Sequence, residues 1–155
     1  AESASGVNLL GFHPGTSVLN WIRGNINRGY PVIHISVHTF TPILHEKIRR
    51  CDIGILYDPG RKTEKIFARA WINSLKATLD NFITRANYPY RGKADNFNTF
   101  LRKIFSFEQY LGVEIEVNQK FPLREKRKWP VMRKKIVASL VKVIPCHIWK
   151  NPHFH

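Results

Sequence analysis

The residue with the clearest chemical potential is His38, which ends a segment that reads as a strand. Residues 31–38, PVIHISVH, are rich in β-branched residues and alternate, so His34, Ser36 and His38 share one face. Open α/β sheets bind ligands at the carboxyl ends of their strands, where a neutral imidazole can ligate zinc. A histidine held by loop hydrogen bonds is the alternative interpretation of His38. His34 lies roughly 6 to 7 Å back along the strand, so we interpret it as structural or as support for His38.

A second polar face lies on residues 111–118, LGVEIEVN, which alternate as a strand does. Glu114, Glu116 and Asn118 point one way, opposite to the apolar residues between them. Two carboxylates at this separation can raise each other's proton affinity enough for acid–base chemistry. The alternative is an exposed polar sheet face, which is common on half-buried strands.

A third candidate is the loop NYPYRGKAD, residues 87–95, in which Arg91 and Lys93 flank a glycine. An arginine fork with a nearby lysine suits the carboxylate of a substrate. An arginine that only pairs with a surface acid is an equally common finding, and the sequence leaves both readings open.

The elements that would position these side chains follow from hydrophobic periodicity. Helices are predicted at residues 16–28, 63–85, from a cap at Asp95 or Asn96 onward, and at about 129–144, with strands at 31–38, 53–57 and 111–118. Helices that alternate with short strands predict an α/β domain, a layered sheet with helices on both faces and mainly parallel neighbours. Three strands make this predicted sheet thin.

The bulk composition indicates one domain, residues 1–155, with 43% hydrophobic residues and a formal charge of +14. The basic excess is concentrated in the last third, where it predicts either a solvated helix face or a surface that contacts nucleic-acid phosphates. No apolar run approaches the roughly 20 residues needed to cross a bilayer. Two distant cysteines indicate neither a disulfide framework nor a zinc knuckle, so a reducing cytoplasm is the expected location.

Four segments occur together and in order: VIHISVHTFTP at 32–42, DIGILYDPGR at 52–61, NYPYRGKAD at 87–95 and GVEIEVNQ at 112–119. In this combination the chain resembles the N-formylglutamate amidohydrolase family, from about Trp21 to Gln119. The resemblance implies a zinc-exopeptidase-like fold and hydrolysis of the amide of an N-acyl amino acid, such as N-formylglutamate, the substrate that gives the family its name.

The resemblance also implies roles for individual residues. By the matching positions, His38 resembles a zinc ligand, and Glu116 resembles the carboxylate that assists the metal-bound water and protonates the leaving amine. Arg91, with Asn87 and Lys93 beside it, falls in the loop suited to the substrate carboxylate.

One feature of the family pattern is missing, because no H-x-x-E occurs and nothing before Trp21 resembles the family's first histidine and acidic ligand. Open catalytic zinc sites use about three protein ligands. We therefore expect an incomplete amidohydrolase-like domain, the C-terminal part of one, with weak or absent zinc binding and little activity on its own. The missing ligands could come from an amino-terminal segment, self-association or another partner. The alternatives are a catalytically inactive relative and a basic nucleic-acid-binding module.

Overall fold

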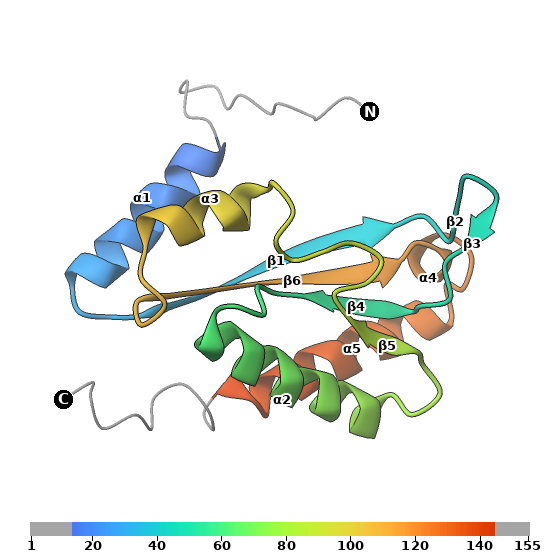
Figure 1. Cartoon of the computed structure of the whole chain (residues 1–155). Coiled ribbons are helices and arrows are strands. Elements are labelled where there is room, and N and C mark those ends of the chain that lie inside the picture. Colours follow the sequence, from blue (N-terminus) through green and yellow to red (C-terminus); the bar gives the residue numbers. More distant parts are fainter. Residues whose placement is uncertain (1–13, 145–155) are drawn as a thin grey trace.

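Helices flank both faces of one mixed sheet in this protein, as the computed structural model in Figure 1 shows. The structure describes residues 14–144. The predicted α/β class is confirmed, with a mostly parallel sheet. None of the helices in this range is long and apolar enough to cross a membrane.

The main sheet has four strands in the order β1-β6-β4-β5. The strands are β1 (Val32–Phe40), β4 (Ile53–Leu56), β5 (Thr84–Ala86) and β6 (Tyr110–Asn118), and a separate hairpin pairs β2 (Ile43–Leu44) with β3 (Lys47–Ile48). The β1–β6 and β4–β5 pairs are parallel. The strands at 31–38, 53–57 and 111–118 are thus confirmed to within about two residues, whereas β5 was not predicted.

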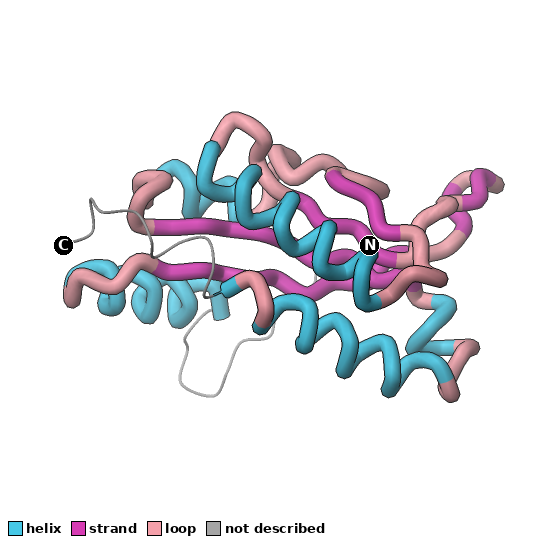
Figure 2. The backbone as a smooth tube through the Cα atoms, turned by 90° about the horizontal axis from the view of Figure 1, so that it is seen from below, coloured by secondary structure: helices cyan, strands magenta, loops and turns pink. Residues whose placement is uncertain are grey.

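The helices form two layers around this sheet. They are α1 (Pro14–Asn27), α2 (Lys62–Thr78), α3 (Phe97–Ile104), the short α4 (Lys120–Leu123) and α5 (Lys128–Val141). In Figure 1, α1 and α3 lie above the sheet and α2 and α5 lie below it. Figure 2, seen from the side of α2 and α5, shows how these helices lie over the strands.

The sheet, predicted to have mainly parallel neighbours, contains one antiparallel pair, because β4 runs antiparallel to β6. The chain leaves β1 through the β2–β3 hairpin, not through a crossover helix, and so returns to the sheet in the opposite direction. Gly54 then stands opposite Glu116 in the register. No helix was predicted between the strands at 31–38 and 53–57, and this connection contains none.

The predicted helix at 63–85 is too long, since α2 ends at Thr78. Apolar residues do continue at helical spacing, but Leu79 leaves the helical region with φ −128° and ψ 59°. The backbone after Leu79 pairs with the segment around β4 instead. The Asp52 and Ile53 amides both donate to the Ile83 carbonyl, at 2.8 and 3.1 Å. This pairing leads into β5, so sheet formation overrides the helical pattern.

The largest apolar core lies between the sheet and the layer of α2 and α5. Phe67, Trp71 and Leu75 of α2 pack there with Val113 and Ile115 of β6, and all five are buried. The opposite face carries a smaller cluster beneath α1 and α3. The polar faces of β1 and β6 therefore point toward α3.

Because Leu75 is completely buried, we expect Leu75→Ala to lower the free energy of unfolding by about 2 kcal/mol or more through lost burial and a cavity. Urea unfolding followed by circular dichroism measures this. Ile66→Ala, on the exposed side of the same helix, is the matched control with an expected change below about 1 kcal/mol. Equal losses at both positions would show that this core assignment is wrong.

Candidate active site

A pocket of about 200 Å³ lies where β1 and β6 approach their carboxyl ends, beneath the start of α3. Its lining residues are Ser36, His38, Asn96, Phe97, Asn98, Glu114 and Glu116. In the parallel β1–β6 register, His38 stands beside Glu116 and Ser36 beside Glu114. The structure thus brings His38 and Glu116 together in one pocket, as the sequence predicts.

The Glu116 carboxyl is the most unusual group in the pocket. The residue is 5% exposed, and its Oε2 atom has no hydrogen-bond partner among the described residues. Burial, together with the negative charge of Glu114, raises the pKa of Glu116 to about 7, although the positive charge of Arg49 acts in the opposite direction. A carboxyl that titrates near neutral pH can both accept and return a proton.

Glu114 is buried as well, but its carboxylate is hydrogen-bonded. Its Oε1 atom accepts from the side-chain amides of Asn96 at 2.6 Å and Asn98 at 3.4 Å. Burial raises the pKa of Glu114, while the nearby charges of His38 and Arg102 and the two amides lower it. The two carboxylates on one face therefore differ in their surroundings, and Glu116 is the one with a fully buried oxygen that has no partner among the described residues.

Asn96 reaches Glu114 because it is the N-cap of α3. Its side-chain oxygen accepts from the Thr99 amide at 2.9 Å, which satisfies one of the free donors of the first turn. The sequence predicted this cap at Asp95 or Asn96, but not that the amide of the same side chain would hold a pocket carboxylate.

Beneath α3, a chain of hydrogen bonds runs from His34 to Glu114. His34 Nδ1 lies 2.9 Å from the Tyr110 hydroxyl, which donates to Asn98 Oδ1 at 3.1 Å, and Asn98 in turn donates to Glu114. Burial lowers the pKa of His34, which favours its neutral form. Because the Tyr110 hydroxyl donates its hydrogen to Asn98, Nδ1 is the donor in the contact with Tyr110. The hydrogen bonds of His34 lead to Tyr110 and Ser36 and not to His38, which agrees with the structural interpretation of His34.

The loop with Asn87, Arg91 and Lys93 lies beside the pocket, but none of the three residues lines it. The Asn87 side-chain oxygen accepts from the backbone amides of Tyr57 at 3.0 Å and Gly92 at 3.1 Å. Asn87 thus holds the loop in place. Lys93 forms an ion pair with Asp58 at 3.3 Å, and Arg91 is exposed.

Gly54 explains how this loop can approach the site. A Cβ atom at this position would collide with the Tyr88 carbonyl oxygen and would touch the Glu116 Cβ at 3.4 Å. The loop backbone therefore rests directly on β4, next to Glu116, and only glycine leaves room for it.

The prediction that His38 is a zinc ligand can be compared with the side chains that surround it. Within residues 14–144, no three His, Cys, Asp or Glu side chains gather closely enough to hold a metal ion. His38 offers an exposed imidazole, Glu114 Oε1 accepts from two amides, and Glu116 Oε2 is buried without a partner. This set fits one ligand with a neighbouring base, and it does not fit a complete zinc site.

The basic residues of α5 lie on the far side of the sheet from this pocket (Figure 1). In α5, Met132 and Ser139 face inward and Arg133, Lys134 and Lys135 are exposed. A second cavity of about 430 Å³ lies there, with apolar and basic side chains in its lining that include Phe82, Phe121 and Lys128. The helix predicted at about 129–144 is confirmed over Lys128–Val141, whereas contact with nucleic acid stays a prediction.

Comparison with known proteins identifies only the fold. No protein-family model and no curated protein matches the chain. Among solved structures, it is similar to the crystal structure of gene product Atu2144 from Agrobacterium tumefaciens, with a TM-score of 0.61 and 22% sequence identity. The match covers 82% of this chain and 49% of that one, so the present chain spans about half the length of its structural neighbour. The fold and pocket define an α/β protein with a buried carboxyl and an imidazole near the carboxyl ends of two parallel strands, β6 and β1.

Proposed function

We propose that this chain contributes the acid–base centre of an amide hydrolase that acts on N-acyl amino acids such as N-formylglutamate. The observation that carries the proposal is Glu116, a buried carboxyl with an unpartnered oxygen that shares a pocket with His38. The order of the four sequence segments that resemble the amidohydrolase family supports the same assignment.

In this proposal, Glu116 takes a proton from the attacking water and delivers it to the leaving amine. A pKa near 7 suits both steps, because the group is then partly ionised and partly protonated at neutral pH. Glu114, fixed by Asn96 and Asn98, maintains the negative charge that helps to keep the Glu116 pKa high. His38 is placed to orient the water or the substrate carbonyl.

Zinc, if bound, would polarise the carbonyl and acidify the water. His38 is the residue of this chain that would contribute to such a site. A complete site would need further ligands beyond those that residues 14–144 bring together.

The test is the release of glutamate from N-formylglutamate by the 155-residue chain with and without added Zn²⁺, together with NMR shift perturbation by the same compound. We expect slow hydrolysis, N-formylglutamate-induced shifts at the pocket residues, and loss of hydrolysis by about 100-fold or to background in Glu116→Gln.

Glu125→Gln is the matched control, since Glu125 lies outside this pocket in an ion pair with Lys128. Hydrolysis that is equally fast in Glu116→Gln and the wild type would contradict the proposal. Absence of both hydrolysis and pocket shifts at millimolar N-formylglutamate would also contradict it.

A further inference from the structure

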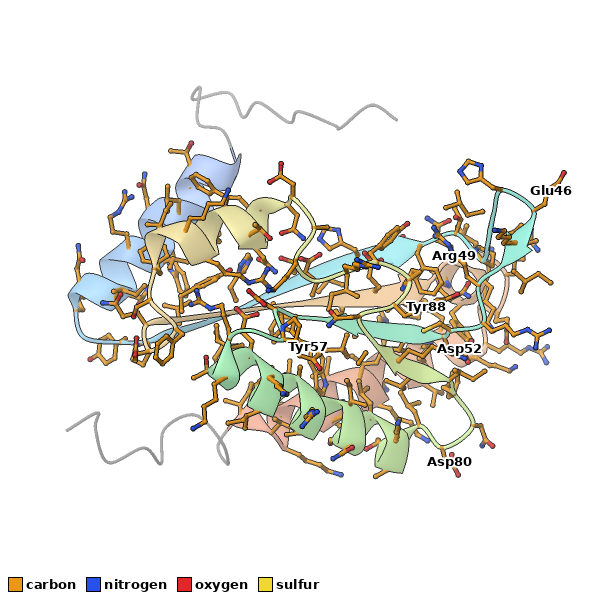
Figure 3. All side chains as sticks on the ribbon, in the orientation of Figure 1. Glu46, Arg49, Asp52, Tyr57, Asp80 and Tyr88 are labelled. Carbon is orange, nitrogen blue, oxygen red and sulfur yellow. The ribbon has the colours of Figure 1, made fainter. Side chains whose placement is uncertain are left out.

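Arg49 is a cationic side chain at the same edge of the sheet that the sequence patterns did not single out. It follows the β2–β3 hairpin and is half-buried near the end of β1, where Figure 3 shows it. Its guanidinium carbon lies 5.0 Å from the centre of the Tyr90 ring and 6.0 Å from that of Phe40. Contact with two aromatic rings restricts the guanidinium and keeps part of its hydration away.

The hydrogen bonds of Arg49 leave much of its donor capacity free. One terminal nitrogen, Nη1, donates to the Tyr90 hydroxyl at 3.1 Å and to the Thr41 carbonyl at 3.4 Å. Ion pairs in the described part of the chain involve Arg61, Arg102 and three lysines, and Arg49 forms none of them. A guanidinium has five N–H donors arranged as a planar fork, which suits two-point contact with a carboxylate.

Arg49 also contacts the loop that lies next to Glu116. Its guanidinium packs against Tyr90, and the Tyr88 carbonyl of the same loop lies over Gly54, beside the Glu116 side chain. The positive charge of Arg49 lowers the pKa of Glu116, against the effects of burial and of Glu114. The charge of Arg49 therefore influences the ionisation of Glu116. In an N-acyl amino acid the α-carboxylate is separated from the amide nitrogen by a single carbon, so a base at the amide and a cation at the carboxylate must be near neighbours.

We propose that Arg49, held by Tyr90 and Phe40, is the subsite that binds the carboxylate of the substrate. This inference rests on the proposed function and assigns to the half-buried Arg49 the role expected of Arg91, which is exposed. Neither arginine lines the 200 Å³ pocket itself, so the carboxylate subsite would lie beside it. The occupant is an N-acyl amino acid with a free carboxylate. A neutral amide of the same shape lacks the charge that would pair with the guanidinium.

The experiment compares binding of N-acetylglutamate with binding of its uncharged diamide, by calorimetry or NMR titration. We expect Arg49→Met to weaken N-acetylglutamate binding about tenfold or more, because a charge-assisted bidentate contact is lost. Arg49→Lys should recover only part of the affinity, since an ammonium lacks the planar fork. Arg91→Met is the matched control and should bind as the wild type does.

The preference for N-acetylglutamate over its diamide distinguishes a loss of the carboxylate contact from a general disruption of the pocket. The diamide should bind weakly and to the same extent in all variants, whereas a collapsed pocket would weaken both compounds. Unchanged N-acetylglutamate affinity in Arg49→Met, a loss in Arg91→Met instead, or equal affinities of the wild type for the two compounds would overturn the inference. If binding depends on Arg49 but hydrolysis does not depend on Glu116, the subsite stands and the proposed function fails.

Discussion

Replacement of Arg102 by methionine is expected to lower the free energy of unfolding by about 3 to 5 kcal/mol, because it leaves a buried carboxylate without its main partner. Arg102 Nε lies 3.0 Å from Glu64 Oε1, and the two side chains are 6% and 0% exposed. Arg61 Nε also approaches this oxygen, at 3.3 Å, but a single remaining cation compensates a buried charge less well.

The same guanidinium joins three segments of the fold. It donates to the Gly92 carbonyl at 2.6 Å and to the Gly112 carbonyl at 2.9 Å, while Glu64 accepts from the Asp58 amide at 2.9 Å. Loss of Arg102 therefore leaves backbone acceptors of the loop and of β6 unpaired as well, which adds to the cost.

Chemical unfolding monitored by circular dichroism measures this effect, with Lys128→Met as the matched control. Lys128 also pairs with a glutamate, Glu125, but it is 65% exposed, so its removal should cost less than about 1 kcal/mol. A loss below about 1 kcal/mol in Arg102→Met as well would show that Arg102 is not the main partner of the buried Glu64 carboxylate.

The sequence predicted those parts of the fold whose signals are local. The alternation of residues 111–118 and the helical spacing from Phe67 to Leu75 each reflect a face that is buried, so strand β6 and helix α2 were found. The end of α2 and the direction of β4 depend on which strand pairs with which, and no residue pattern within α2 or β4 records that choice. Strand β5 has only three residues, Thr84–Ala86, too few for periodicity to show.

In the candidate site, too, the residues with a local sequence signal were predicted and those that depend on distant partners were not. His38 and Glu116 were predicted because strand periodicity places them on polar faces, and the parallel register sets them side by side. Asn98 and Tyr110 were missed because their partners are up to 76 positions away in the chain, where no spacing rule applies. Arg49 was missed for a related reason, since its neighbours Phe40 and Tyr90 come from separate segments.

Glu116 is expected to make the stability of the protein decrease as the pH rises from about 4.5 to about 7. Burial, together with the negative charge of Glu114, raises its pKa from 4.5 to about 7 in the folded state, so the folded protein binds this proton more tightly than the unfolded chain does. Below pH 4.5 the carboxyl is protonated in both states, and its favourable contribution is complete. Above pH 7 it is ionised in both, and the folded state bears a cost of about 3 kcal/mol for the buried charge.

Glutamine at position 116 keeps the shape of the side chain and removes the titration, so the difference in unfolding free energy between Glu116→Gln and the wild type isolates this effect. The variant should gain about 3 kcal/mol relative to the wild type between pH 4 and pH 8. A second variant, Glu114→Gln, removes the neighbouring negative charge and should move the Glu116 pKa downward, because that charge is the second cause of its elevation. Carbon-13 NMR of the glutamate carboxyls over the same pH range measures the pKa of Glu116 directly, both in the wild type and in Glu114→Gln. A Glu116 that titrates near 4.5 in the folded protein would contradict the buried, unpartnered carboxyl on which the proposed proton transfer depends.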